Sequence, residues 1–172
     1  MKVFYLLRHA KSDSTVTGLP DAERPLNAHG KRAAPMIGAA MRKADIAPAM
    51  VLCSFAQRAV ETWSLLSPEL RVSIPVKTMR SLYLASPSRI LSILHRLPHS
   101  VPSALVLAHN PGLHTLSRVL AGSGSDRRAV ASLQENYPTG ALAEFRFPVD
   151  DWSEVKSGGG QLVRFLRPRD LE

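Results

Sequence analysis

The sequence predicts an α/β fold of three layers, α/β/α, with helices on both faces of a mainly parallel sheet. Short runs that are apolar throughout occur at residues 3–7, 50–53 and 104–108, as expected for strands that are buried on both faces. Between these runs, apolar residues recur at every third or fourth position, which is the period of a helix. This alternation of strands and helices is typical of a sheet whose strands are mainly parallel.

The first half of the chain is predicted to contain three strands and two helices. Asn27 is placed to cap the first of these helices, and Ser67-Pro68 is expected to end the second. The predicted elements are a strand over residues 3–7, a helix over 28–44, a strand over 50–53, a helix over 54–66 and a strand over 74–78.

The second half is predicted to contain three further strands and three helices. Ser86-Pro87 and Asn110-Pro111 each have the pattern of an N-cap followed by the first helical residue. A glycine-rich turn at residues 157–160 separates the last two strands, which we expect to pair as an antiparallel hairpin at a sheet edge. The predicted elements are a helix over residues 87–97, a strand over 104–108, helices over 111–122 and 126–135, and strands over 140–147 and 161–166.

The composition indicates a single globular domain over residues 1–172, with 45% hydrophobic and 21% charged residues. No apolar run approaches the roughly 20 residues that a membrane span needs, and the N-terminus lacks the pattern of a signal peptide. The single cysteine, Cys53, allows no internal disulfide and fits a reducing compartment. We therefore expect a cytoplasmic protein with no membrane partner, and we expect Cys53 to be a buried, inert thiol.

The net charge of +8 is compatible with several classes of anionic partner. The basic residues are spread along the chain, and aromatic residues are not interleaved with them in the way that nucleic-acid stacking requires. The positive net charge therefore favours anionic ligands in general. The spread of the basic residues and the lack of interleaved aromatic residues argue against nucleic acid as a partner.

Chemically active side chains follow three of the predicted strands. Arg8 and His9 come directly after the first strand, Ser54 and then Arg58 after the second, and His109 and Asn110 after the fourth. If these strands are parallel, the side chains gather at one edge of the sheet, where open α/β sheets bind ligands.

Two arginines and two histidines in one crevice suit a phosphoryl group. The planar guanidinium of arginine matches phosphate oxygens in a bidentate way, and a neutral imidazole is able to attack phosphorus. The cationic side chains would stabilise the charge that develops on the phosphoryl oxygens, so this scheme needs no metal ion and no cofactor.

Four segments resemble the signatures of the histidine phosphatase superfamily, which has the phosphoglycerate mutase-like fold. Leu7-Arg8-His9-Ala10 is similar to its Arg-His-Gly or Arg-His-Ala signature. Residues 54–62 and 107–112 look like the blocks that supply a second arginine and a second histidine. The Arg24-Pro25-Leu26-x-x-x-Gly30 segment and the short length resemble the SixA-type phosphohistidine phosphatases, which lack the large inserted lid of the mutases.

The resemblance implies that His9 becomes phosphorylated and that Arg8, Arg58 and His109 complete the phosphate pocket. Arg24 is a further candidate for this pocket. The implied reaction is hydrolysis of a phosphomonoester or phosphoramidate through a phosphohistidine intermediate. The expected substrate is phosphohistidine in a signalling protein, and a small phosphorylated molecule is the alternative.

The chain departs from the family where many members carry an acidic proton donor. This sequence has Arg80-Ser81 at that position, without a carboxylate. A phosphohistidine substrate has a basic nitrogen in its leaving group and needs less help from an acid than an alkyl phosphate does. Asp13 and Glu61 are the nearest candidates in sequence, and the general acid stays unassigned.

Less specific interpretations remain open for single residues. Arg58 has the spacing to pair with Glu61 on its own helix, and Arg24 could simply brace its loop. The other four histidines fit surface or packing roles: His29, His95, His99 and His114. A non-catalytic binder of phosphoproteins or nucleic acid is a third function to be weighed against the two hydrolases.

Overall fold

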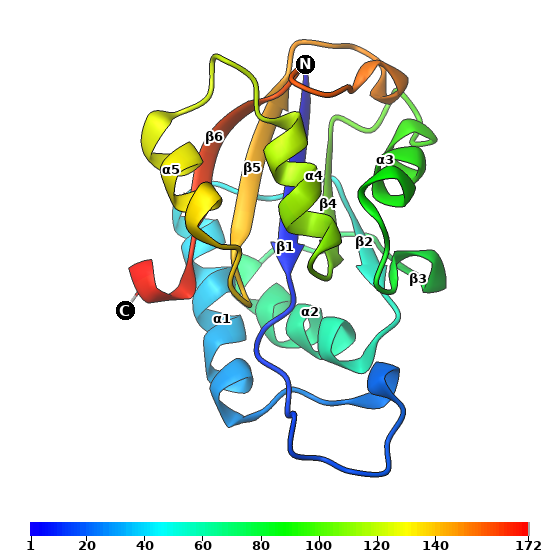
Figure 1. The fold of residues 1–172 in the computed structure, drawn as a ribbon, viewed down its shortest axis with the longest axis vertical. Coiled ribbons are helices and arrows are strands. Elements are labelled where there is room, and N and C mark those ends of the chain that lie inside the picture. Colours follow the sequence, from blue (N-terminus) through cyan, green and yellow to red (C-terminus); the bar gives the residue numbers. More distant parts are fainter. Residues whose placement is uncertain (172) are drawn as a thin grey trace.

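A computed structural model describes residues 1–171, in which six strands form one sheet in the order β3-β2-β4-β1-β5-β6 (Figure 1). Neighbours among the first four strands are parallel, β5 is antiparallel to β1, and β6 is antiparallel to β5. The strands are β1 (Lys2–Arg8), β2 (Met50–Ser54), β3 (Val76–Met79), β4 (Ser103–Ala108), β5 (Leu142–Phe147) and β6 (Gln161–Leu166). The predicted hairpin at the sheet edge is therefore confirmed.

Helices cover both faces of this sheet, which confirms the predicted three layers. On β1, Phe4 and Leu6 point to one face and pack in the cluster that includes the helices of the second half. Tyr5 and Leu7 point to the other face, in the cluster that includes the first two helices. The helices are α1 (Ala28–Lys43) and α2 (Gln57–Leu70) on one face, and α3 (Pro87–His95), α4 (Gly112–Leu120) and α5 (Arg127–Glu135) on the other.

Side-chain caps begin three of the helices. The Asn27 and Ser86 side chains accept hydrogen bonds from backbone N–H groups in the first turns of α1 and α3, as predicted, and Asp126 caps α5 in the same way. Each cap satisfies a donor that has no partner within the helix.

The prediction of a helix over residues 54–66 is wrong at both ends. Ser54 still belongs to β2, where it pairs with Met79, and the Phe55 N–H donates to the Met79 carbonyl. At the other end the helix continues through Pro68, because Leu70 is buried in the same apolar cluster as Leu66. The helix ends at Arg71, whose φ of 56° is in the left-handed region.

The prediction that Asn110 caps the helix beginning at Pro111 is also wrong. Pro111 itself occupies the capping position of α4, without a side-chain hydrogen bond to the helix. The Asn110 Nδ2 instead donates to the Tyr137 carbonyl, at 2.8 Å. The Asn110 side chain therefore hydrogen-bonds the backbone carbonyl of Tyr137 and does not cap the helix.

Two glycines allow close backbone approaches that shape the site. A Cβ at Gly30 would lie 2.2 Å from the Lys11 carbonyl oxygen, so glycine lets the loop after β1 pack on α1. A Cβ at Gly112 would lie 2.0 Å from the Ala85 carbonyl oxygen, so glycine lets the segment before α3 pack on α4.

Cys53 is 1% exposed, which confirms the expectation of a buried thiol, and burial raises the pKa of this thiol to about 12, as expected for an inert cysteine. None of the helices within residues 1–171 has the length and apolar character that crossing a membrane requires.

Candidate active site

The predicted phosphate-binding residues meet in one crevice at the carboxyl ends of β1, β2 and β4. These strands are parallel neighbours, so the residues that follow them lie at the same edge of the sheet. The crevice has a volume of about 450 Å³, and the five residues predicted from the sequence line it: Arg8, His9, Arg24, Arg58 and His109.

His9 follows β1 and is 6% exposed. Its Nδ1 lies 2.7 Å from the Ala10 carbonyl oxygen. Because a carbonyl oxygen only accepts, Nδ1 carries the proton and the lone pair is on Nε2. Burial lowers the pKa of His9 to about 3; the bond to Ala10 opposes this shift, and His109, Arg58 and Arg8 act in the same direction as burial. The ring is therefore a neutral imidazole at pH 7, with Nε2 able to act as a nucleophile.

His109 follows β4, and its ring centroid lies 5.1 Å from that of His9. Its Nε2 lies 2.7 Å from Ser54 Oγ, while Nδ1 is buried without a hydrogen-bond partner. Burial lowers the pKa of His109 to about 4, and the charge of Arg58 acts in the same direction. Nδ1 is thus the ring nitrogen that is free to hold or exchange a proton.

Arg8 and Arg58 supply permanent positive charge beside the two imidazoles. Arg8 Nη1 donates to the Tyr137 carbonyl at 2.9 Å, and Arg58 Nη1 donates to the Asp21 carbonyl at 2.8 Å. The Nε atoms of both arginines are buried and have no partner. Burial lowers the pKa of Arg8, and the like charge of Arg58 adds to this effect. A buried guanidinium and a half-buried one, each with an unpartnered Nε–H, favour the binding of an anion.

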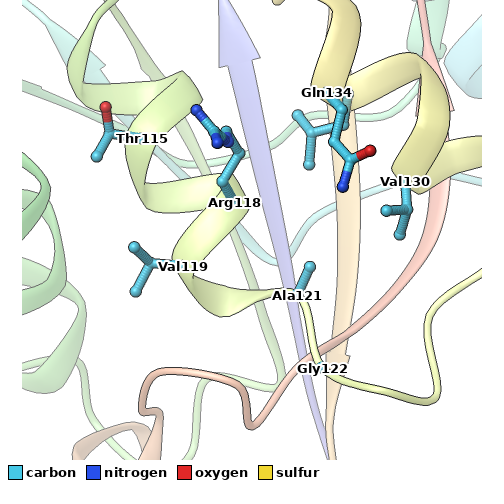
Figure 2. Close-up of a pocket in the computed structure, with 8 residues that line it drawn as sticks. Thr115, Arg118, Val119, Ala121, Gly122, Val130 and Gln134 are labelled. Atoms are coloured by element: carbon cyan, nitrogen blue, oxygen red, sulfur yellow. The ribbon is translucent and has the colours of Figure 1, made fainter.

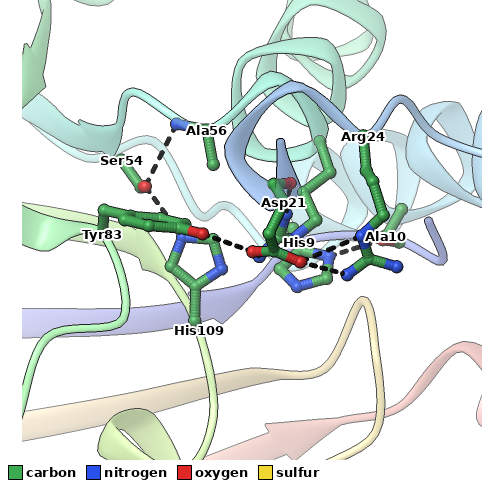
Figure 3. A network of polar contacts seen from close by, with 9 residues as sticks. His9, Ala10, Asp21, Arg24, Ser54, Ala56, Tyr83 and His109 are labelled. Atoms are coloured by element: carbon green, nitrogen blue, oxygen red, sulfur yellow. Dashed lines mark hydrogen bonds and ion pairs between the residues drawn. The ribbon is translucent and has the colours of Figure 1, made fainter. Parts of the chain in front are cut away.

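Asp21 is a functional candidate that sequence reasoning missed (Figure 3). It begins a short 3-10 helix over Asp21–Glu23, and its Oδ2 lies 3.0 Å from Arg58 Nη2. The Tyr83 hydroxyl donates to the same oxygen, and Arg24 Nε donates to Oδ1 at 3.0 Å. The hydrogen bond from Tyr83 and the nearby charge of Arg58 lower the pKa of Asp21 to about 2.

The local signal for Asp21 was its spacing from Arg24, since residues three apart on a helical turn share a face. The two carboxylates considered from the sequence lie elsewhere. Asp13 accepts from Thr15 in an exposed turn, and Glu61 accepts from the Leu26 N–H. The Arg58 guanidinium pairs with Asp21, and the expected alternative, a pair with Glu61, is not the contact that forms.

Asn110 also lines the crevice, at the sheet edge where the sequence placed it but without the capping role that the sequence assigned to it. Its Nδ2 shares the Tyr137 carbonyl with Arg8, and its Oδ1 is buried without a partner. Two of the remaining histidines hydrogen-bond distant carbonyls, His95 to Val155 and His114 to Leu133, which agrees with packing roles. Residues 1–171 contain no group of three or more His, Cys, Asp or Glu side chains placed to hold a metal ion.

The crevice thus combines a nucleophilic imidazole, a second imidazole with a free nitrogen, and guanidinium donors. This set is suited to binding a tetrahedral oxyanion and transferring its central atom to nitrogen.

Comparison with known proteins agrees with this chemistry. Residues 4–83 match the model of a family described as the histidine phosphatase superfamily (branch 1). Over 164 residues the chain is 34% identical to an uncharacterized protein of Mycobacterium tuberculosis, and this alignment covers 95% of this chain and 100% of that protein.

Solved structures share the fold over nearly the whole chain. A proposed phosphohistidine phosphatase SixA from Nakamurella multipartitia has a TM-score of 0.83 at 25% identity, covering 97% of this chain and 96% of that one. The protein histidine phosphatase SixA complexed with tungstate has a TM-score of 0.78 at 20% identity, covering 99% of both chains.

Proposed function

The chain belongs to the histidine phosphatase superfamily, and we propose that it hydrolyses phosphoryl groups through a phosphohistidine formed on His9. The observation that carries this proposal is the hydrogen bond from His9 Nδ1 to the Ala10 carbonyl, which leaves the Nε2 lone pair free among the arginines. A nucleophile needs this combination of a free lone pair and a site for the negative charge of its target.

In the proposed binding step, Arg8 and Arg58 hold the phosphoryl oxygens, and Arg24 adds a third cation. The unpartnered Nε atoms of Arg8 and Arg58 support this assignment. Asp21 is a positioning residue, because its carboxylate holds Arg24, Arg58 and the Tyr83 hydroxyl together. With a pKa of about 2, this carboxylate is ionised at neutral pH and holds no proton to donate.

In the proposed transfer step, His9 Nε2 attacks phosphorus as the bond to the leaving group breaks. A bound phosphoryl dianion raises the pKa of His109, because a nearby opposite charge favours the imidazolium. The imidazolium then gives its Nδ1 proton to the leaving group, while Nε2–H stays bound to Ser54. Water next attacks the phosphohistidine and returns a proton to His109 Nδ1, which releases inorganic phosphate.

Trapping the intermediate tests this mechanism. The protein is mixed with a phosphohistidine-bearing domain and quenched in alkali, in which phosphohistidine is stable. We expect phosphate on the wild-type chain and none on His9→Ala. Full turnover by His9→Ala would exclude the mechanism.

The substrate class is the second part of the proposal: phosphohistidine in a signalling protein. Its support is the absence of a carboxylate at Arg80-Ser81, since a nitrogen leaving group depends least on a strong acid. A crevice of about 450 Å³ would also admit a small phosphomonoester. A panel of sugar and nucleotide phosphates separates the two, and strong turnover of one metabolite without turnover of phosphohistidine would reverse the assignment.

A further inference from the structure

A second concave site, the α3 groove, lies between α3 and the edge strand β3 and has a volume of about 340 Å³. Its apolar lining comes from the sheet, from α3 and from the segment that follows α3: Met50, Leu52, Met79, Ile93 and Leu97. Its cationic lining consists of Lys77, Arg89 and Arg96, whose side chains are exposed. The groove therefore presents apolar and positively charged surface together.

The cations of the α3 groove have no anionic partner. Within residues 1–171, no carboxylate lies within ion-pair distance of Lys77, Arg89 or Arg96. The sequence explains this, because residues 70–125 contain six Lys and Arg and no Asp or Glu. Like charges that no internal carboxylate balances create a positive potential that attracts a negatively charged partner.

A short series of residue contacts links the α3 groove to the phosphate pocket, although the two concavities share no lining residue. Met79 lines the groove, and its carbonyl accepts from the Phe55 N–H at 3.2 Å. The Arg80 guanidinium lies 4.8 Å from the centre of the Phe55 ring, and this ring meets Tyr83 edge-on at 5.4 Å. The Tyr83 ring in turn lies 5.6 Å from that of His109. A folded protein bound in the groove would therefore have to extend across Phe55 and Tyr83 to place its phosphoryl group in the pocket.

A hollow between α4 and α5, with a volume of about 420 Å³, is less informative (Figure 2). Arg118 is its one cation, and Val119, Val130 and Gln134 are among its other lining residues. This mixture does not select one class of ligand.

We propose that the α3 groove docks an acidic segment of the phosphorylated substrate protein, with apolar side chains of that segment on the groove floor. The inference rests on the proposed function, which places the phosphohistidine of the same partner in the pocket. Charge complementarity selects an acidic segment, and the apolar floor selects a protein over a nucleic acid, whose bases need the aromatic platforms that the groove lining lacks.

Charge reversal in the groove tests the proposal. The triple variant Lys77→Glu/Arg89→Glu/Arg96→Glu is compared with the matched control Lys31→Glu/Arg32→Glu/Arg127→Glu, which changes net charge equally at exposed positions. The probes are a negatively charged histidine phosphotransfer domain phosphorylated on its histidine, a short peptide around that histidine, and para-nitrophenyl phosphate. We expect KM for the domain to rise about tenfold in the groove variant only, with the two small substrates within about twofold of wild type.

An equal effect of both triple variants, or an equal effect on the domain and the peptide, would overturn docking at the groove. Ile93→Ser, which leaves the charge unchanged, is expected to weaken binding of the domain several-fold, and unchanged binding would remove the apolar part of the proposal. Groove-dependent binding of phosphatidylserine vesicles or single-stranded RNA, without binding of the domain, would assign the groove to another class of partner.

Failure of docking is distinguishable from failure of the proposed function. If the wild-type protein hydrolyses para-nitrophenyl phosphate but not the phosphorylated domain, the substrate assignment is wrong. Docking is then decided by the affinity of the unphosphorylated domain, measured by fluorescence anisotropy. Equal affinity for wild type and the groove variant would overturn it, and a loss confined to the groove variant would support it.

Discussion

The phosphate pocket and the α3 groove both collect arginine, but they hold it in opposite ways. In the pocket, Arg58 is 3% exposed and is paired with Asp21, and its Nε still has no partner. In the groove, Arg89 and Arg96 are exposed, and no carboxylate among residues 1–171 lies within ion-pair distance of either. A buried guanidinium with unpartnered N–H groups is stabilised by an anion at hydrogen-bond distance. An exposed guanidinium is hydrated, and its attraction for an anion is weak and is screened by salt. The same residue type is therefore suited to catalysis in one region and to recognition in the other.

The largest expected difference between the two regions is in turnover of a small substrate. Arg58→Ala is expected to lower kcat/KM for para-nitrophenyl phosphate by roughly 10²–10³-fold, because it removes a preorganised donor to the phosphoryl oxygens. Arg89→Ala, the matched change in the groove, is expected to alter it by less than about twofold. Similar losses in steady-state assays of the two variants would remove the distinction.

The buried histidines of the pocket should also make stability depend on pH. Folding holds the pKa of His9 near 3 and that of His109 near 4, below the ordinary value of 6.5. The unfolded chain therefore binds more protons as pH falls below 6.5, and stability is lost down to the folded pKa values. Each histidine contributes a slope of up to about 1.4 kcal/mol per pH unit.

Urea unfolding at pH 7, 6 and 5 measures this slope. His9→Asn should reduce the dependence of the unfolding free energy on pH by the contribution of one histidine. An unchanged slope in His9→Asn would mean that the imidazole titrates normally in the folded protein.

A smaller effect is expected from the hydroxyl that positions His109. Ser54→Ala removes the 2.7 Å hydrogen bond to Nε2 and should lower kcat about tenfold, in line with one hydrogen bond. The loss should increase with the pKa of the leaving group in a series of aryl phosphates, since the proposed mechanism assigns protonation of that group to His109. Ser92→Ala, in the groove, is the control and should behave as wild type; a loss that is equal for all leaving groups would contradict the role of Ser54.

The smallest effect is expected from a change at Asp21, and it concerns inhibition by inorganic phosphate. Asp21→Asn removes a negative charge that pairs with Arg58 and would repel a bound anion. Inorganic phosphate should therefore inhibit this variant several-fold more tightly. Asp13→Asn changes a carboxylate that contacts Thr15 outside the crevice and should leave inhibition unchanged. Weaker inhibition of Asp21→Asn would show that holding the arginines in place outweighs charge repulsion.

The sequence alone predicted the layers, the order of the strands and helices, and four of the residues that line the crevice, and the family resemblance added Arg24. These features depend on local information: apolar runs, helical spacing, and residues that come directly after strands, such as His9 and His109. Parallel pairing of β1, β4 and β2 then places the carboxyl ends of these strands at the same edge of the sheet.

Only the tertiary structure identified the partner of Arg58 and the α3 groove. Asp21 meets Arg58 from 37 residues away and Tyr83 from 62 residues away, so its role depends on how two loops pack. The sequence contains a long stretch without acidic residues, but its cations become a surface only when α3 lies beside β3. Local patterns determine which elements form, whereas contacts between loops distant in sequence depend on the packing of the whole chain.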